Sequence, residues 1–269
     1  MKGLKRLFNE LLRTTGIYPP RDTAARFLQA IKNNDVAAIQ HTLKQHPTAT
    51  RWLLTDPEKP RAPADIGIFT GIKNNALGAV DAMLLHDPEL IHLRDQAIEK
   101  NSVLHHGAAA SRAMTMLLMH HHADINAVNA IGETPVMWAR DDDEANVILD
   151  RNPDLSLKDR EGRDAIFHLS RRGLAQAVRN IVKKSPIPHL LEYAGPALTA
   201  VFQKISLFPR PEIACFDVAY ALMPYAPAVH AETPFLKDVF DKACRIVGHP
   251  LTPLLQEGLK TAPVYQPVI

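Results

Sequence analysis

The sequence predicts an all-α protein in which similar helix pairs are stacked one on the next. Two observations carry this prediction. The segments from Asn129 to Ala139 and from Asp159 to Leu169 follow one pattern, with Gly132 and Gly162 standing 30 residues apart. In addition, five amphipathic segments end in a similar way, each with an apolar residue four positions before its end point. Self-similarity at a fixed interval of this length is typical of helical repeat arrays.

The repeated pattern extends beyond these two glycines. The same 30-residue interval relates three further pairs, which are Asn129 and Asp159, Thr134 and Asp164, and Asp124 and Asp154. The five end points are Pro47, Pro88, Ala123, Pro153 and Pro186, and the apolar residues before them are Leu43, Leu84, Met119, Leu149 and Val182. We expect each segment to be a helix with one apolar face, which ends where proline or a polar turn interrupts it.

The motifs in the middle of the chain resemble those of the ankyrin-repeat family. Residues 132–139 (GETPVMWA) are similar to the Thr-Pro-Leu-His motif that begins the family's first helix. Residues 102–108 (SVLHHGA) match the same motif, with Ser in place of Thr and Val in place of Pro. Residues 122–127 (HADINA) resemble the family's Gly-Ala-Asp-Val-Asn-Ala loop. The resemblance covers residues 22–186 and implies five helix pairs, in units of about 33 residues. Thr134 and Asp164 are expected to cap helices, and Pro135 suits a first helical position.

We divide the chain into three parts. Residues 1–20 are predicted to form an amphipathic capping helix and a linker, because five apolar residues between Leu4 and Leu12 share one helix face. Contact of residues 1–15 with a membrane surface is the alternative, which we favour less because the ends of a repeat array need a cover. Residues 21–186 hold the repeats, including a proline-rich surface loop from Thr55 to Pro63.

The third part, residues 187–269, shows a weaker pattern. We expect helices at 196–205, 211–223, 233–247 and 250–257, because prolines separate these apolar stretches. The tail from Thr261 to Ile269 is expected to be flexible or extended. These helices are either decayed repeats or a separate capping unit, and their apolar content predicts that they pack on the last repeat.

Composition narrows the classes of function. Hydrophobic residues make up 46% and charged residues 22% of the chain, which is typical of a globular protein rather than a disordered one. The formal net charge of +2 gives no overall attraction to nucleic acid. No apolar run approaches the roughly 18 residues of a membrane span. The cysteines, Cys215 and Cys244, suggest no disulfide framework, so we expect a reducing compartment. We therefore expect a cytoplasmic protein, in the bacterial cytosol or, if the degenerate repeats and the non-repeat tail belong to a secreted effector, in the cytosol of a host cell.

Histidines and an acidic run could suggest a metal site, but we favour structural roles for both. His120, His121 and His122 are consecutive, so on a helix their side chains point in different directions and cannot all bind one ion. His105 matches the histidine of the ankyrin motif, which implies a structural hydrogen bond. The run from Asp141 to Glu144 lies where a second helix should begin, and carboxylates there cap N–H groups. We expect no metal and no cofactor.

A cysteine nucleophile is the remaining chemical candidate. Cys215 lies on a predicted amphipathic helix and would need a nearby base, for which the candidates are His189, His230 and His249. We favour the other interpretation, in which Cys215 is a small buried hydrophobic residue.

The chain thus offers a surface rather than a reaction centre. In ankyrin-type proteins, loop tips and first helices form a concave face that binds a protein partner. The resemblance implies that the residues at the matching positions of this chain contact a partner. These positions are Asn129, Ile131, Glu133, Trp138, Arg140, Arg160, Glu161 and Arg163, with packing of Trp138 inside the stack as an alternative. The predicted function is a non-catalytic protein-interaction module, such as an adaptor, a scaffold or a bacterial effector. The alternative is an enzyme whose site lies in residues 187–269, with the repeats as a targeting module.

Overall fold

The computed structural model describes residues 21–54, 65–184, 187–207, 212–225, 236–243 and 253. The chain divides into two compact units, residues 1–131 and residues 132–269. Among the described residues, the only paired strands are β1 (Leu53–Leu54) and β2 (Asp65–Ile66), which are antiparallel with Leu53 opposite Ile66. Nearly all other regular structure is helical, so the predicted all-α class is confirmed.

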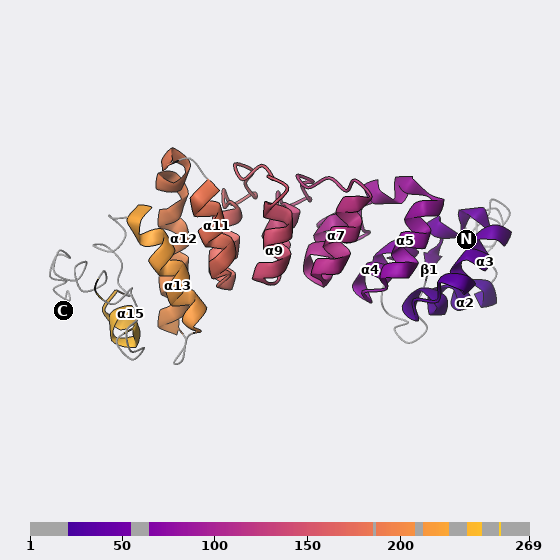
Figure 1. Cartoon of the computed structure of the whole chain (residues 1–269), viewed down its shortest axis with the longest axis horizontal. Helices are drawn as coiled ribbons and strands as arrows, with labels where there is room; N and C mark the ends of the chain where they lie inside the picture. The colour runs from indigo at the N-terminus through magenta and orange to yellow at the C-terminus, as the bar shows by residue number, and fades with distance from the viewer. Residues whose placement is uncertain are drawn as a thin grey trace, which may run out of the picture. The chain divides into compact units, whose positions relative to one another are not determined.

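The first unit contains three helix pairs (Figure 1). The pairs are α2 (Arg21–Lys32) with α3 (Val36–Gln45), α4 (Gly67–Lys73) with α5 (Leu77–His86), and α6 (Val103–Ala110) with α7 (Arg112–His120). Short 3-10 helices, η1 (Pro47–Arg51) and η2 (Pro88–His92), follow α3 and α5. The first helices α2, α4 and α6 pack in succession, and so do the second helices α3, α5 and α7.

The second unit continues with the same kind of pairing. It contains α8 (Pro135–Trp138) with α9 (Asp142–Leu149) and α10 (Ala165–Arg172) with α11 (Ala175–Lys184). These are followed by α12 (Ile187–Leu207), α13 (Ile213–Leu222), η3 (Met223–Tyr225) and α15 (Leu236–Ala243). Helix α10 packs between α8 and α12, and α11 packs between α9 and α13. Helices α12 and α13 therefore pack on α10 and α11, as their apolar content predicts.

The apolar residue before each end point lies in the core, as the sequence predicts. Leu43, Leu84, Met119 and Leu149 are buried on α3, α5, α7 and α9, and Val182 on α11 is half-buried. Each of these second helices ends shortly before its end point. The spacing of apolar residues locates these helices correctly, because residues three or four positions apart lie on one face of a helix and that face is buried in the core.

Two of the three expected helix caps are present. The Asp164 carboxylate accepts the Phe167 N–H at 3.0 Å, and the Asp141 carboxylate accepts the Glu144 N–H at 2.9 Å. The prediction for Thr134 was wrong, because its hydroxyl is buried without a hydrogen-bond partner. Helix α8 is a single turn, and the Met137 N–H that a cap would bind is held by the Thr134 backbone carbonyl at 3.0 Å.

The predicted start of the first C-terminal helix was also wrong. Helix α12 begins at Ile187 rather than at Pro196, and it runs through this proline to Leu207. Pro196 is exposed, while Ala197, Val201 and Phe202 on the opposite face are fully buried. A proline inside a helix destabilises it by about 3 kcal/mol. Burial of the apolar face of α12 stabilises the helix by more than this amount.

Several predictions concern other parts of the chain. The N-terminal helix, the loop from Thr55 to Pro63, the helix at 250–257 apart from residue 253, and the tail lie outside the described residues. Helices α13 and α15 lie within the predicted segments 211–223 and 233–247. In the described part of the chain, no helix combines the length and apolar character that crossing a membrane requires.

Candidate functional site at the hairpin tips

The loop tip before α10 is a tight hairpin organised by Asp159. One carboxylate oxygen of Asp159 accepts the backbone N–H groups of Glu161 and Arg163, both at 2.9 Å. The Asp159 N–H donates to the Arg163 carbonyl at 2.9 Å, which closes the hairpin. Gly162 completes the turn with a φ of 78°, a conformation that side chains rarely adopt. The backbone of this tip is therefore held in one conformation by a single buried side chain.

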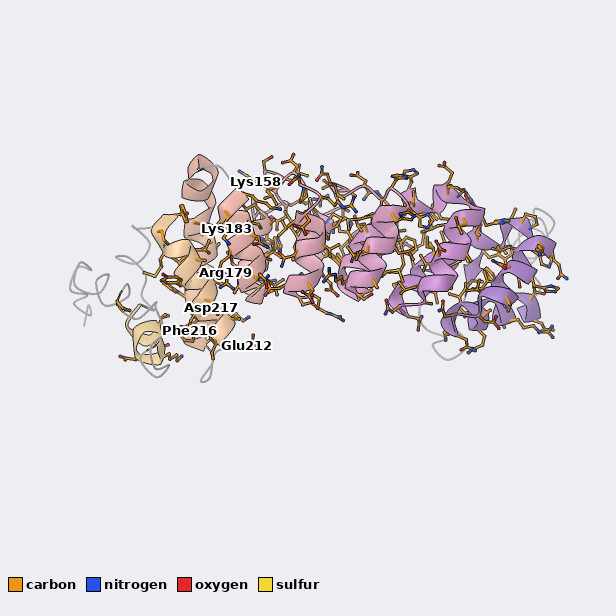
Figure 2. All side chains as sticks on the ribbon, in the orientation of Figure 1. Lys158, Arg179, Lys183, Glu212, Phe216 and Asp217 are labelled. Carbon is orange, nitrogen blue, oxygen red and sulfur yellow. The ribbon has the colours of Figure 1, made fainter. Side chains whose placement is uncertain are left out.

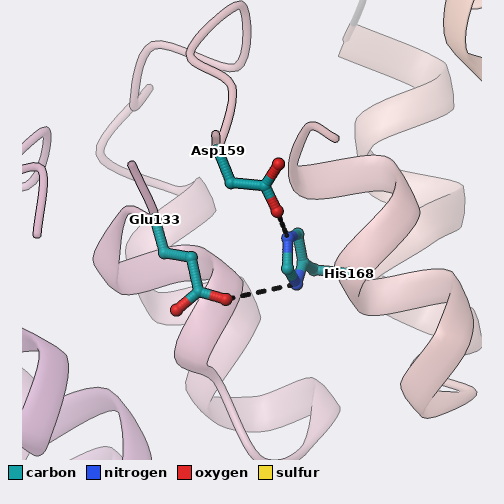
Figure 3. Close-up of side chains that lie close together, drawn as sticks. All are labelled: Glu133, Asp159 and His168. Atoms are coloured by element: carbon teal, nitrogen blue, oxygen red, sulfur yellow. Dashed lines mark hydrogen bonds and ion pairs between the residues drawn. The ribbon is translucent and has the colours of Figure 1, made fainter. Parts of the chain in front are cut away.

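The other oxygen of Asp159 joins the tip to helix α10. It lies 2.9 Å from Nε2 of His168 and accepts Nε–H of Arg163 at 2.7 Å. On the other side of the imidazole, Nδ1 lies 3.8 Å from Oε1 of Glu133 (Figure 3). The second oxygen of Glu133 accepts the indole N–H of Trp138 at 2.6 Å. We call Glu133, Asp159, Arg163 and His168 the Asp159 cluster.

Burial and hydrogen bonds together set the protonation states of Asp159 and His168. The side chains of Asp159 and His168 are only 2% and 4% exposed. Burial lowers the pKa of His168 below its usual value, and the neighbouring carboxylates offset this only in part. Burial opposes ionisation of Asp159, but hydrogen bonds from Arg163, His168 and Glu161 outweigh it, so the pKa of Asp159 is lowered. A neutral His168 therefore donates Nε2–H to an ionised Asp159 near neutral pH.

The Asp159 cluster contains residue types that ligate metals, and the positions of their side chains decide whether they could bind an ion. One candidate atom from each of Glu133, Asp159 and His168 lies within 4.8 Å of the others. However, Asp159 Oδ2 is already in contact with both His168 and the Arg163 guanidinium. An ion on this oxygen would lie beside a fixed positive charge, which is unfavourable. The geometry fits a structural hydrogen-bond network better than a metal centre.

The first unit contains the same arrangement at the tip before α6. One oxygen of Asp95 accepts the N–H groups of Ala97 and Asn101 at 3.1 Å, and the Asp95 N–H donates to the Asn101 carbonyl. The other oxygen of Asp95 lies 2.8 Å from Nε2 of His106. The pKa of Asp95 is lowered, because hydrogen bonds from His106 and Asn101 outweigh the effect of burial. Each unit therefore fixes a tip to a first helix through an Asp–His pair.

The two Asp–His pairs were not predicted from the sequence, although a signal for them is present there. Each histidine stands four residues after the residue that caps its helix, as His106 does after Ser102 and His168 after Asp164. The ankyrin motif directs attention to His105 instead, whose Nδ1 lies 2.7 Å from the Ser102 hydroxyl. His105 is completely buried, so its contact with the cap is structural.

The eight predicted binding residues divide into exposed and buried groups. The exposed ones are Ile131, Arg140, Arg160 and Glu161, whereas Glu133, Trp138 and Arg163 are partly buried and Asn129 is buried. The Asn129 side chain donates to Asn101 and accepts the Ile131 N–H, so it organises a tip. Arg163 contacts both Asp159 and Glu161.

The other candidate chemical groups take local roles in the described part of the chain. Nε2 of His121 lies 2.7 Å from Asp81, while His120 and His122 are exposed. Cys215 is 1% exposed, and burial raises the pKa of its thiol. The proposed bases for Cys215, namely His189, His230 and His249, have side chains outside the described residues.

Comparisons with known proteins add no relative. No known protein-family model matches the chain, and no curated protein matches it in sequence.

Proposed function

We propose that this chain is a non-catalytic protein-interaction module whose helix pairs form ankyrin-type repeats. The loop tips and the first helices are the surface that holds the partner. Support for the repeat comes from the regular pairing of α8 with α9 and α10 with α11, and from the family-like motifs at residues 102–108 and 132–139. On the same argument, α12 and α13 are a further, degenerate repeat rather than a separate fold.

The observation that carries the proposal is that rigid tips present exposed side chains. In the tip before α10, Asp159 fixes the backbone, whereas Arg160 is exposed and the Glu161 side chain is 68% exposed. In the tip before α6, Asp95 fixes the backbone and Ile98 is 91% exposed. Because the backbone is already ordered, a partner that binds these side chains loses little conformational entropy of the tip. Such preorganisation suits recognition.

The enzyme alternative finds less support at Cys215. A cysteine nucleophile acts as a thiolate in an accessible, electropositive setting. The Cys215 thiol is instead buried, and its raised pKa keeps it protonated near neutral pH. Lys204 lies close enough to favour the thiolate, but its effect is smaller than that of burial.

The proposal is tested by capture of partners with the full-length chain, followed by affinity measurement with each purified partner. We choose Arg160→Glu as the tip variant, because Arg160 makes no ion pair with any described residue. The matched control is Arg179→Glu, which changes another exposed arginine, on α11 (Figure 2). We expect Arg160→Glu to weaken the affinity at least tenfold, which corresponds to about 1.4 kcal/mol. Arg179→Glu and Cys215→Ala should leave it unchanged.

Two results would contradict the proposal. Equal loss of affinity in Arg160→Glu and Arg179→Glu would show that the tip is not the binding surface. Loss of the biological effect in Cys215→Ala, with stability and partner affinity intact, would support the enzyme alternative.

A further inference from the structure

The exposed face of α10 carries a stripe of arginine and aromatic side chains. Phe167 and Arg171 are four residues apart and lie on one side of α10, and Arg163 stands just before the N-cap Asp164. The Arg163 guanidinium lies 5.5 Å from the centre of the Phe167 ring, in a cation–π arrangement. Phe167 is half-buried and Arg171 is exposed. The stripe therefore offers a half-buried ring with the paired Arg163 on one side and the exposed Arg171 on the other.

The carboxylates near this stripe are already engaged. Asp159 accepts hydrogen bonds from Arg163 and His168, and Asp164 caps α10. The exposed Glu161 pairs with Arg163, with the Arg163 guanidinium 2.5 Å from its carboxylate. Arg171 forms no ion pair with any described residue, and the same holds for Arg160 at the tip. Arg160 and Arg171 thus present to solvent positive charges that form no ion pair with the described residues, whereas Arg163 is paired.

A second arginine strengthens the positive potential at the end of the stripe. Arg172 donates to the Ala139 carbonyl at 2.5 Å, which holds it against the adjacent α8 segment. Burial lowers the pKa of Arg172, the Glu133 carboxylate raises it, and Arg171 lowers it by repulsion, so the two arginines lie close enough to interact. An incoming carboxylate would relieve this repulsion.

From this charge pattern we propose that Arg160 of the tip, together with Phe167 and Arg171 of α10, binds an acidic segment of a partner protein. Carboxylates of the segment pair with Arg160 and Arg171, and an apolar side chain packs on the Phe167 ring. Arginine and aromatic residues are the types that contribute most to protein interfaces. A protein segment fits better than nucleic acid, because the free arginines are few and are interrupted by Glu161, whereas nucleic-acid sites present continuous basic surfaces. This inference rests on the proposed function and specifies its partner.

The probe is a fluorescein-labelled peptide of about twelve residues, composed of Asp and Glu around a central Leu and Phe. Its matched control replaces every Asp with Asn and every Glu with Gln. Fluorescence anisotropy with the full-length chain should show at least tenfold tighter binding of the acidic peptide, weakening as salt screens the charges. Arg171→Glu should reduce its affinity at least tenfold, whereas Arg179→Glu on α11 should not. Phe167→Ala should weaken both peptides, because both carry the apolar side chains.

The outcomes separate this inference from the function on which it rests. If the neutral peptide binds as tightly as the acidic one, or if Arg171→Glu has no effect, the acidic class of partner is wrong. In that case, capture of a partner that depends on Arg160 would still support the binding function. If anionic vesicles or single-stranded RNA bind more tightly than the acidic peptide, with the same dependence on Arg171, the ligand is not a protein segment. Failure of both the peptides and the capture experiment would overturn both proposals.

Discussion

Replacement of Asp159 by alanine tests whether one buried carboxylate organises the tip before α10. The substitution removes the acceptor for four hydrogen bonds, donated by the Glu161 N–H, the Arg163 N–H, the Arg163 guanidinium and His168. Water can solvate Arg163 in part, because its side chain is 28% exposed, but His168 is 4% exposed. Each donor left buried without a partner costs about 1–3 kcal/mol.

The expected loss of stability follows mainly from His168, because its side chain is 4% exposed and water cannot readily replace the lost acceptor of Nε2–H. We expect Asp159→Ala to lower the free energy of unfolding by about 1–3 kcal/mol, the cost of leaving the buried His168 donor without its acceptor. Asp159→Asn should cost less. It retains an oxygen for the backbone N–H groups, but it turns an NH2 group towards His168 and Arg163.

The measurement is urea-induced unfolding of the full-length chain, followed by tryptophan fluorescence. The chain has two tryptophans, and Trp52→Phe leaves Trp138 as the reporter of the second unit. The control is Asp154→Ala in the preceding loop. Its carboxylate accepts hydrogen bonds from the Ser156 N–H and hydroxyl on the surface, so we expect a loss of at most about 1 kcal/mol. A loss below about 0.5 kcal/mol for Asp159→Ala would refute the central role of this carboxylate.

Three further predictions concern the core, pH and the glycine turns. Leu149→Ala should lower the free energy of unfolding by about 2–5 kcal/mol in the same assay, because Leu149 is 2% exposed. A loss as small as that of a surface substitution would show that the predicted helix register is wrong. The pKa of His168 is below 6.5 and that of Asp159 is below 3.8 in the folded state, so the unfolded chain binds more protons. Stability should therefore fall as pH drops below about 6.5 and again below about 3.8, and His168→Gln should remove the first decrease in urea midpoint. Gly132→Ala should destabilise the protein more than Gly162→Ala. Both glycines have positive φ, but only at Gly132 would the new Cβ meet backbone, at 2.8 Å from Asp159 Cα. Equal melting temperatures of the two variants would contradict this prediction.

The caps and the core positions were accessible from the sequence because they depend on neighbours within one or two turns. Asp164 and Asp141 were correctly predicted as caps, and each bonds an N–H three residues ahead. Leu149 was correctly placed in the core from the spacing of apolar residues. The binding role of Arg160 stays a prediction, although its exposure is compatible with it. Arg163 was grouped with Arg160, yet the structure gives it a second task in holding Asp159.

The sequence by itself determined where the second helix of each pair lies, which face of it is apolar and where the turns at Gly132 and Gly162 fall, because these properties follow from residue spacing and local hydrogen bonding. Only the tertiary structure decided that His168 meets Asp159 and Glu133, since this contact requires the hairpin to fold back on α10. It also decided that α12 continues through Pro196, because the burial of Val201 and Phe202 outweighs a local preference to stop. Local sequence patterns cannot predict the free energy of such burial, because it arises only when segments distant in sequence pack together and exclude water.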